Sequence, residues 1–148
     1  MNDIPDDFLT EESNKIWGTQ NRVVGLFTNS YMNYIDERKK DEPSLVEMST
    51  KALKLLKNSA KSGFFLMVEG GLIDKAHHQN WALRSMREVK EFDETVEAVF
   101  DLLSDEEKEE TLIVVTADHG HTFTRWLLRF DSISTFLSLF LRFSSFFS

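Results

Sequence analysis

The chain has 148 residues, a formal net charge of -8 and a pI near 5.0, and this length fits one domain with a modest core. The acidic balance argues against nucleic acid as a partner, because proteins that bind a phosphate backbone concentrate Lys and Arg. The absence of cysteine excludes a disulfide framework and leaves carboxylates and imidazoles as the candidate metal ligands.

Residues 1–21 are expected to form a short amphipathic helix or a loop. The first residues, Met1-Asn2-Asp3-Ile4-Pro5, lack the basic and apolar regions of a secretory signal. We therefore expect either a cytosolic protein or an amino terminus that lies further upstream.

Two strands and a helix are predicted between residues 22 and 68. Residues 22–27 have strand composition. After Pro43, a capping box of Ser44 and Glu47 and apolar residues at helical spacing predict a helix over 44–58. Residues 64–68 form a continuous apolar run, which is typical of a strand buried on both faces.

A long helix is predicted from about residue 76 to 103. Its expected apolar face consists of Leu83, Met86, Val89, Val96, Val99, Phe100 and Leu103. Residues 104–110 are read as an acidic, solvated loop, and residues 111–116 as a second buried strand. The alternation of strands and helices predicts an α/β fold, with a partial doubly wound, mostly parallel sheet and flanking helices.

The composition changes abruptly at residue 125, because residues 125–148 consist largely of Phe, Leu and Ser. Arg129, Asp131 and Arg142 interrupt every window of about twenty residues, so a membrane span is not predicted. We interpret the segment as unrelated to the preceding fold, for example as read-through into non-coding sequence. It is expected to pack poorly, and its deletion is expected to leave the rest no less stable.

Acidic and imidazole side chains follow each of the two buried strands. The first group is Glu69, Asp74, His77 and His78, and the second is Asp118, His119 and His121. The carboxyl ends of parallel strands meet at one edge of a sheet, where ligands bind. Asp74 and His78 are four residues apart, so on a helix they share one face and can bind one metal. The pattern predicts a metal site built for hydrolysis.

Residues 64–71 (Phe-Phe-Leu-Met-Val-Glu-Gly-Gly), with Asp74 and His78 and then the 116–121 block, resemble the metal-binding half of an alkaline phosphatase. The likeness extends upstream through residues 24–27 and 42–45, so it covers roughly 22–124. It implies that Glu69 binds magnesium, that Asp74 and His78 bind one zinc, and that Asp118 and His119 bind a second zinc. It also implies phosphate monoester substrates and a homodimer. Family members are lipid-anchored at the cell surface or secreted, whereas we find neither the signal nor the anchor in this chain.

The chain departs from the family pattern at the reaction centre. No serine matches the family nucleophile, and the phosphate-binding arginine has no counterpart, so no catalytic residue is assigned. We expect the chain to bind zinc weakly and to be inactive alone. His77 is read as a non-ligand, His121 as an outer-shell residue, and Lys75 as a residue that tunes substrate or water.

Two alternatives stay open at this point. One is another member of the wider metal-dependent superfamily, which includes phosphoglycerate mutases, sulfatases and nucleotide pyrophosphatases. The other is a non-catalytic remnant that keeps a partial zinc site or only the fold. The Glu-Gly-Gly block with Asp74 and His78 favours an alkaline phosphatase, whereas the missing nucleophile favours the remnant.

Overall fold

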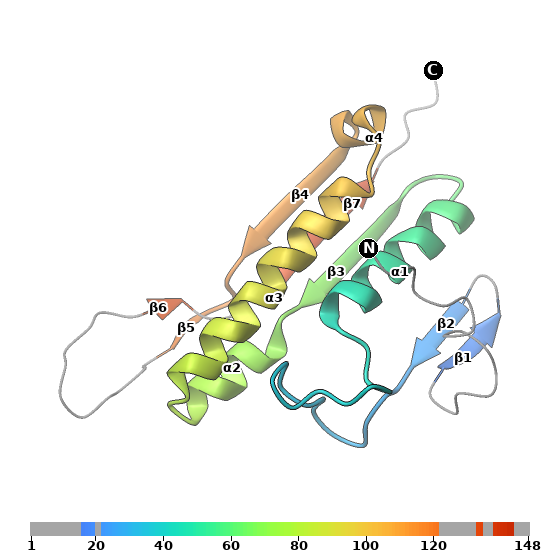
Figure 1. Ribbon diagram of the computed structural model, residues 1–148. Coiled ribbons are helices and arrows are strands. Elements are labelled where there is room, and N and C mark those ends of the chain that lie inside the picture. Colours follow the sequence, from blue (N-terminus) through green and yellow to red (C-terminus); the bar gives the residue numbers. More distant parts are fainter. Residues whose placement is uncertain (1–15, 20–21, 122–132, 135–137, 144–148) are drawn as a thin grey trace.

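The computed structural model describes the backbone of residues 16–19, 22–121, 133–134 and 138–143, and the side chains of residues 23–121 (Figure 1). The strands are β1 (Ile16–Thr19), β2 (Arg22–Gly25), β3 (Phe64–Glu69), β4 (Thr111–Thr116), β5 (Gly120–His121), β6 (Ile133–Ser134) and β7 (Ser138–Phe143). The helices are α1 (Leu45–Ser59), α2 (Gly71–His78), α3 (Ala82–Asp101) and α4 (Asp105–Glu109). The chain is therefore a mixed helix and strand structure, as expected.

The main sheet has the strand order β3-β7-β4, with β7 antiparallel to both of its neighbours. β3 and β4 consequently run in the same direction, which agrees with the expected crossover, but they are not adjacent. The expectation of mostly parallel pairing is wrong for the described strands, because every strand pair among them is antiparallel. Glu69 and Thr116 both pair with Ser138, so the carboxyl ends of β3 and β4 lie level.

The central position of β7 corrects our interpretation of the last segment. Residues 138–143 pair along their whole length with both β3 and β4, so this part is integrated into the sheet. A Phe- and Leu-rich sequence is unsuited to a solvated helix but suits a strand between two others. Residues 125–132, 135–137 and 144–148 lie outside the described part of the chain.

The amino-terminal elements form a separate hairpin. β1 pairs with β2 in antiparallel register, from Ile16 opposite Gly25 to Thr19 opposite Arg22. The expected helix or loop over 1–21 is thus wrong at residues 16–19, and residues 1–15 lie outside the described part. The strand predicted over residues 22–27 is present at residues 22–25, but it pairs in this hairpin instead of the main sheet.

Helices α1 and α3 cover one face of the main sheet (Figure 1). The buried core residues are Leu53, Val68, Ile73, Phe92, Val99 and Leu103, with Phe64, Leu66 and Ile113 packed against them. Phe65, Met67, Leu112 and Val114, which alternate with these positions on β3 and β4, are exposed. The prediction that both faces of these strands are buried is therefore wrong in this chain.

Helix α1 begins where its sequence predicts. The Ser44 hydroxyl accepts a hydrogen bond from the Glu47 N–H at 3.0 Å, and the Glu47 carboxylate accepts one from the Ser44 N–H at 2.7 Å. This capping box satisfies amide groups that the first turn leaves unpaired. The same arrangement at Ser104 and Glu107 begins the short helix α4, where we had expected a loop.

The predicted helix over 76–103 is divided into α2 and α3. The break lies at residues 79–81, where Asn80 adopts a positive φ of 56°. Asparagine tolerates this left-handed conformation better than most residues do, which explains why the chain turns here. The described part of the chain contains no helix long and apolar enough to cross a membrane.

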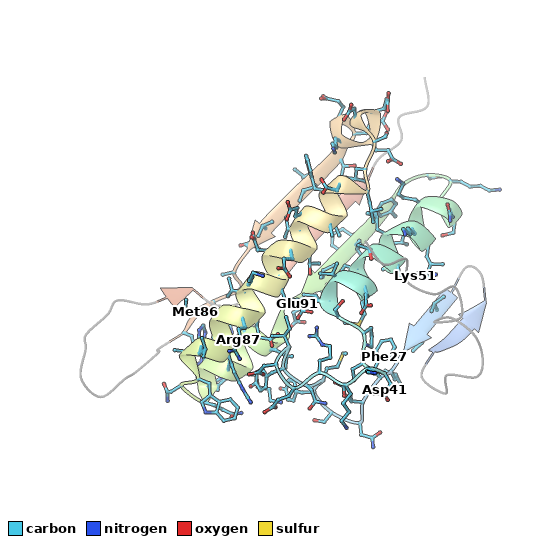
Figure 2. The ribbon with its side chains drawn as sticks, viewed as in Figure 1. Phe27, Asp41, Lys51, Met86, Arg87 and Glu91 are labelled. Atoms are coloured by element: carbon cyan, nitrogen blue, oxygen red, sulfur yellow. The ribbon has the colours of Figure 1, made fainter. Side chains whose placement is uncertain are left out.

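The apolar face predicted for α3 is confirmed in part. Val99 and Leu103 are buried and Val89 and Val96 pack against the core, whereas Leu83, Met86 and Phe100 are exposed. The buried residues of α3 also include Ser85, Glu88, Glu91, Phe92 and Thr95. Figure 2 shows Glu91 on the side of α3 that faces the residues leading into α1. Glu88 accepts a hydrogen bond from the Ile35 N–H at 2.8 Å, and Glu91 accepts one from the Leu45 N–H at 3.2 Å. These carboxylates accept hydrogen bonds from loop amides that need a partner. This requirement explains why two charged residues are buried on α3.

Candidate metal centre

Asp74 and His78 lie one turn apart on α2, which begins directly after β3. The Nε2 atom of His78 is 3.3 Å from Oδ2 of Asp74. Side chains four residues apart on a helix are neighbours, so the spacing alone produces this contact. The predicted pairing of these two side chains is therefore present in the structure.

His121 joins this pair from β5, a separate part of the chain. Its Nε2 atom lies 3.7 Å from Oδ1 of Asp74, and its ring packs edge-on against that of His78 with centroids 4.5 Å apart. One ligand atom from each of Asp74, His78 and His121 lies within 4.8 Å of the others, so the three could share a metal ion. The sequence reading kept His121 outside the ligand set, although it recognised the residue as close to the site.

The burial of this group differs from one side chain to the next. The side chains of Asp74 and His121 are 17% and 14% exposed, whereas that of His78 is 68% exposed. Oδ1 of Asp74 and Nδ1 of His121 are buried and have no hydrogen-bond partner within the described residues. A buried polar atom without a partner is costly, and a metal ion bound to Oδ1 of Asp74 would satisfy that oxygen. One carboxylate and two imidazoles are a donor set that zinc accepts.

His77 contacts α3, and its ring also lies near that of His121, with centroids 5.6 Å apart. Its Nε2 atom is 2.5 Å from the Ser85 hydroxyl oxygen, and both residues are buried. Burial lowers the pKa of His77, and the nearby His121 lowers it further, against a smaller raising effect of Asp74. The ring thus links α2 to α3, and the group of Asp74, His78 and His121 does not include it.

Glu69 ends β3 beside a cavity of about 170 Å³. Gly70, Gly71, Arg38, Glu88 and Glu91 also line this cavity. Glu69 is exposed and does not belong to the group of Asp74, His78 and His121. The structure places it at the carboxyl edge of the sheet, level with the end of β4.

Asp118 and His119 follow β4 and are about half exposed. The Nε2 atom of His119 is 3.6 Å from Oδ2 of Asp118, and its Nδ1 atom is 3.0 Å from the carbonyl oxygen of Gly120. Within the described residues these two side chains form no group with a third ligand. The structure therefore brings Asp74, His78 and His121 together, but it does not add Asp118 and His119 to that group.

The comparisons with known proteins identify the family. The family model described as alkaline phosphatase matches residues 8–137, which is most of the chain. The chain belongs to the alkaline phosphatase family. This match includes residues 125–137, which we had separated from the family-like segment.

Curated alkaline phosphatases align with about 70% of the chain. Alkaline phosphatase 4 of Drosophila melanogaster is 44% identical over 110 residues, which are 72% of this chain and 18% of that protein. The tissue-nonspecific alkaline phosphatase isozyme of Homo sapiens is 42% identical over 103 residues, which are 69% of this chain and 19% of that protein. Alkaline phosphatase 3 of Bacillus subtilis is 37% identical over 113 residues, which are 76% of this chain and 24% of that protein.

The chain spans about a fifth of the length of these curated alkaline phosphatases. No solved structure gives a significant match. The sequence comparisons therefore establish the family, and the geometry described above supplies the detail of the site.

Proposed function

We propose that this protein is the metal-binding segment of an enzyme that hydrolyses phosphate monoesters at a site with two zinc ions and one magnesium ion. The observation that carries the proposal is the approach of His121 and His78 to Asp74 from different elements. Family membership supports the reaction class, because the matching relatives are alkaline phosphatases.

The residues that would hold the metals come from three places on one edge of the sheet. Asp74 and His78 would hold one zinc, with His121 against the Asp74 carboxylate, and Asp118 and His119 would contribute to the second. Glu69 would bind magnesium, a hard cation that prefers carboxylate oxygens. When bound, a pair of zinc ions would supply electrostatic stabilisation of the attacking and leaving oxygens of a phosphoryl transfer.

His121 would orient Asp74 in this arrangement. A side chain that contacts a metal-ligating carboxylate fixes its orientation and raises metal affinity, typically by about 10- to 100-fold. The low exposure of Asp74 and His121 favours this role, because water competes poorly for a buried carboxylate.

We further propose that residues 1–148 alone are inactive. The chain offers no serine that matches the family nucleophile and no matching phosphate-binding arginine, so it lacks a covalent route and a preorganised oxyanion contact. Asp118 and His119 together supply two ligands, whereas a catalytic zinc usually needs about three protein ligands.

The test measures zinc content and turnover on the same sample. Purified chain with added zinc and magnesium should bind zinc weakly and should not hydrolyse an aryl phosphate at alkaline pH above the metal background. A double variant, Asp118→Ala with His119→Ala, is the control. Turnover that this control abolishes would show that another residue of the chain serves as the nucleophile, and the claim of inactivity would be wrong.

A further inference from the structure

The His121 ring packs against two other imidazole rings, those of His77 and His78 on α2. The ring centroids of His121 and His77 are 5.6 Å apart, and the two planes are tilted by 40°. The centroids of His121 and His78 are 4.5 Å apart, and their planes are nearly perpendicular, at 89°. In this arrangement Nε2 of His121 is 3.7 Å from Oδ1 of Asp74. The orientation of His121 toward the carboxylate thus depends on its two neighbouring rings.

The backbone around His121 gives the ring little support. β5 consists of Gly120 and His121, which pair with Ser134 and Ile133 of the equally short β6. A two-stranded pairing of this kind is marginally stable in water without further packing. The His121 side chain is nevertheless only 14% exposed. The contacts of its ring with α2 therefore contribute to holding it in place.

Of the two neighbouring rings, that of His77 is the better anchored. His77 is buried, and its Nε2 atom is 2.5 Å from the hydroxyl oxygen of Ser85, which is buried on α3. The side chain of His78, by contrast, is 68% exposed. Helix α3 packs against α2 and contributes Phe92 to the core. A buried hydrogen bond to a well-packed helix fixes the His77 ring, and this ring in turn limits where the His121 ring can lie.

We propose that Ser85 and His77 are positioning residues that hold the His121 ring against the Asp74 carboxylate. The consequence for zinc rests on the proposed function. A fixed His121 keeps the carboxylate oriented before an ion binds, so less conformational entropy is lost on binding. Helix α3 would thus support the candidate metal centre, although the group of Asp74, His78 and His121 includes none of its residues.

The first test measures the environment of His121 in the zinc-free chain by NMR. The chain has four histidines, so the Hε1 signal of His121 can be identified as the one that His121→Ala removes. At about pH 8.5, where an ordinary imidazole is neutral, Ser85→Ala should move this signal toward its random-coil value. Thr95→Val is the matched control, because it also removes a buried hydroxyl of α3, which donates to the Glu91 carbonyl oxygen at 2.7 Å. The control should leave the signal in place.

The second test measures zinc affinity by competition with a chromogenic chelator. Ser85→Ala should weaken binding at least about threefold, but by less than the loss of about 10- to 100-fold expected when a residue that contacts the ligand is removed. His77→Gln keeps an amide that can pair with Ser85 but removes the ring, and it should weaken binding to a similar extent. Thr95→Val should keep the wild-type affinity.

Combining each variant with His121→Ala separates positioning from a general loss of stability. If Ser85 and His77 act through His121, then Ser85→Ala and His77→Gln should change zinc affinity by less than about twofold in the His121→Ala background. A general loosening of α2 against α3 would instead lower the affinity equally in both backgrounds.

Three results would overturn the inference: an unchanged His121 signal in Ser85→Ala, wild-type zinc affinity in Ser85→Ala and His77→Gln, or equal affinity losses with and without His121. A His121 signal that moves as far in Thr95→Val would also overturn it. The zinc-free measurement separates this inference from the proposed function. A signal that moves as expected in a chain that binds no zinc contradicts the zinc site alone, whereas zinc binding with an unchanged signal contradicts this inference alone.

Discussion

The guanidinium of Arg38 donates hydrogen bonds to both carboxylate oxygens of Glu91, one of them at 2.8 Å, and this pair joins the loop before α1 to the middle of α3. The Glu91 side chain is 4% exposed and that of Arg38 is 14% exposed. The same carboxylate accepts a hydrogen bond from the Leu45 N–H, so one buried anion connects the loop, the start of α1 and α3.

We expect Glu91→Ala to lower the free energy of unfolding by about 3 to 5 kcal/mol, because it leaves the buried Arg38 charge and the Leu45 amide without a partner. Urea denaturation followed by circular dichroism measures this loss. Glu94→Ala is the matched control, since it removes an exposed pair with Lys90 and should cost less than about 0.5 kcal/mol. Equal losses in the two variants would show that the Arg38 contact contributes little.

Glu88 should make stability depend on pH in the direction opposite to that of a typical carboxylate. Burial raises the pKa of Glu88, and Glu91 and Asp36 add to this effect, whereas the hydrogen bond from the Ile35 N–H and the charge of Arg38 lower it. Because the folded pKa is raised, the folded state retains the proton over a pH range where the unfolded chain has lost it. The contribution of Glu88 is thus fully present below its unfolded pKa and is lost as pH rises through its folded pKa.

The Glu88→Gln variant isolates this effect, because its amide oxygen can still accept from Ile35 but does not titrate. The free energy of unfolding of the variant minus that of the wild type should increase as pH rises from about 4 to the raised folded pKa of Glu88. Above that pKa the difference should stay constant. Urea denaturation of both proteins across that range gives the difference. A difference that stays constant with pH would mean that Glu88 titrates as it does in the unfolded chain.

Local sequence signals were sufficient for much of this fold. The Ser44 and Glu47 capping box located the start of α1, and the four-residue spacing of Asp74 and His78 placed their side chains together on α2. Both features depend on residues within one helical turn of each other. The two apolar runs predicted as strands likewise became β3 and β4 at the predicted positions.

Features that depend on distant parts of the chain were missed. Glu88 and Glu91 are buried because they accept hydrogen bonds from amides more than forty residues earlier in the chain. The spacing of apolar residues along a helix does not predict such contacts. The insertion of β7 between β3 and β4 is a pairing of segments far apart in sequence. His121 shares a group with Asp74 for the same reason, because the two residues are far apart in sequence.

The role of His121 can be separated from that of the proposed ligands by zinc affinity. Asp74→Ala and His78→Ala should remove zinc binding at this centre, whereas His121→Ala should weaken it about 10- to 100-fold, because it removes the group that orients Asp74. Competition with a chromogenic chelator measures all three. Asp93→Asn, which changes an exposed carboxylate of α3, should leave the affinity unchanged. A His121→Ala variant with wild-type affinity would exclude the orienting role.

The central position of β7 reverses our expectation for the last segment. A chain shortened to end at residue 137 lacks the strand that pairs with both β3 and β4, so the backbone groups that face it lose their partners. We expect a loss of at least about 2 kcal/mol in the free energy of unfolding and a greater tendency to aggregate, because two sheet edges become available for pairing. Ending the chain at residue 143 keeps β7 and should have little effect.

A point substitution tests the same pairing without shortening the chain. Leu141→Pro removes a backbone N–H in the middle of β7, opposite Leu66 and Ile113, and prolines are not tolerated inside a central strand. Leu141→Val preserves the strand and is the control. Hydrogen exchange of the β3 and β4 amides should accelerate in the proline variant and in the chain that ends at residue 137. Unchanged protection of these amides in both would mean that β7 does not occupy the centre of the sheet in solution, and the segment could then be removed without loss.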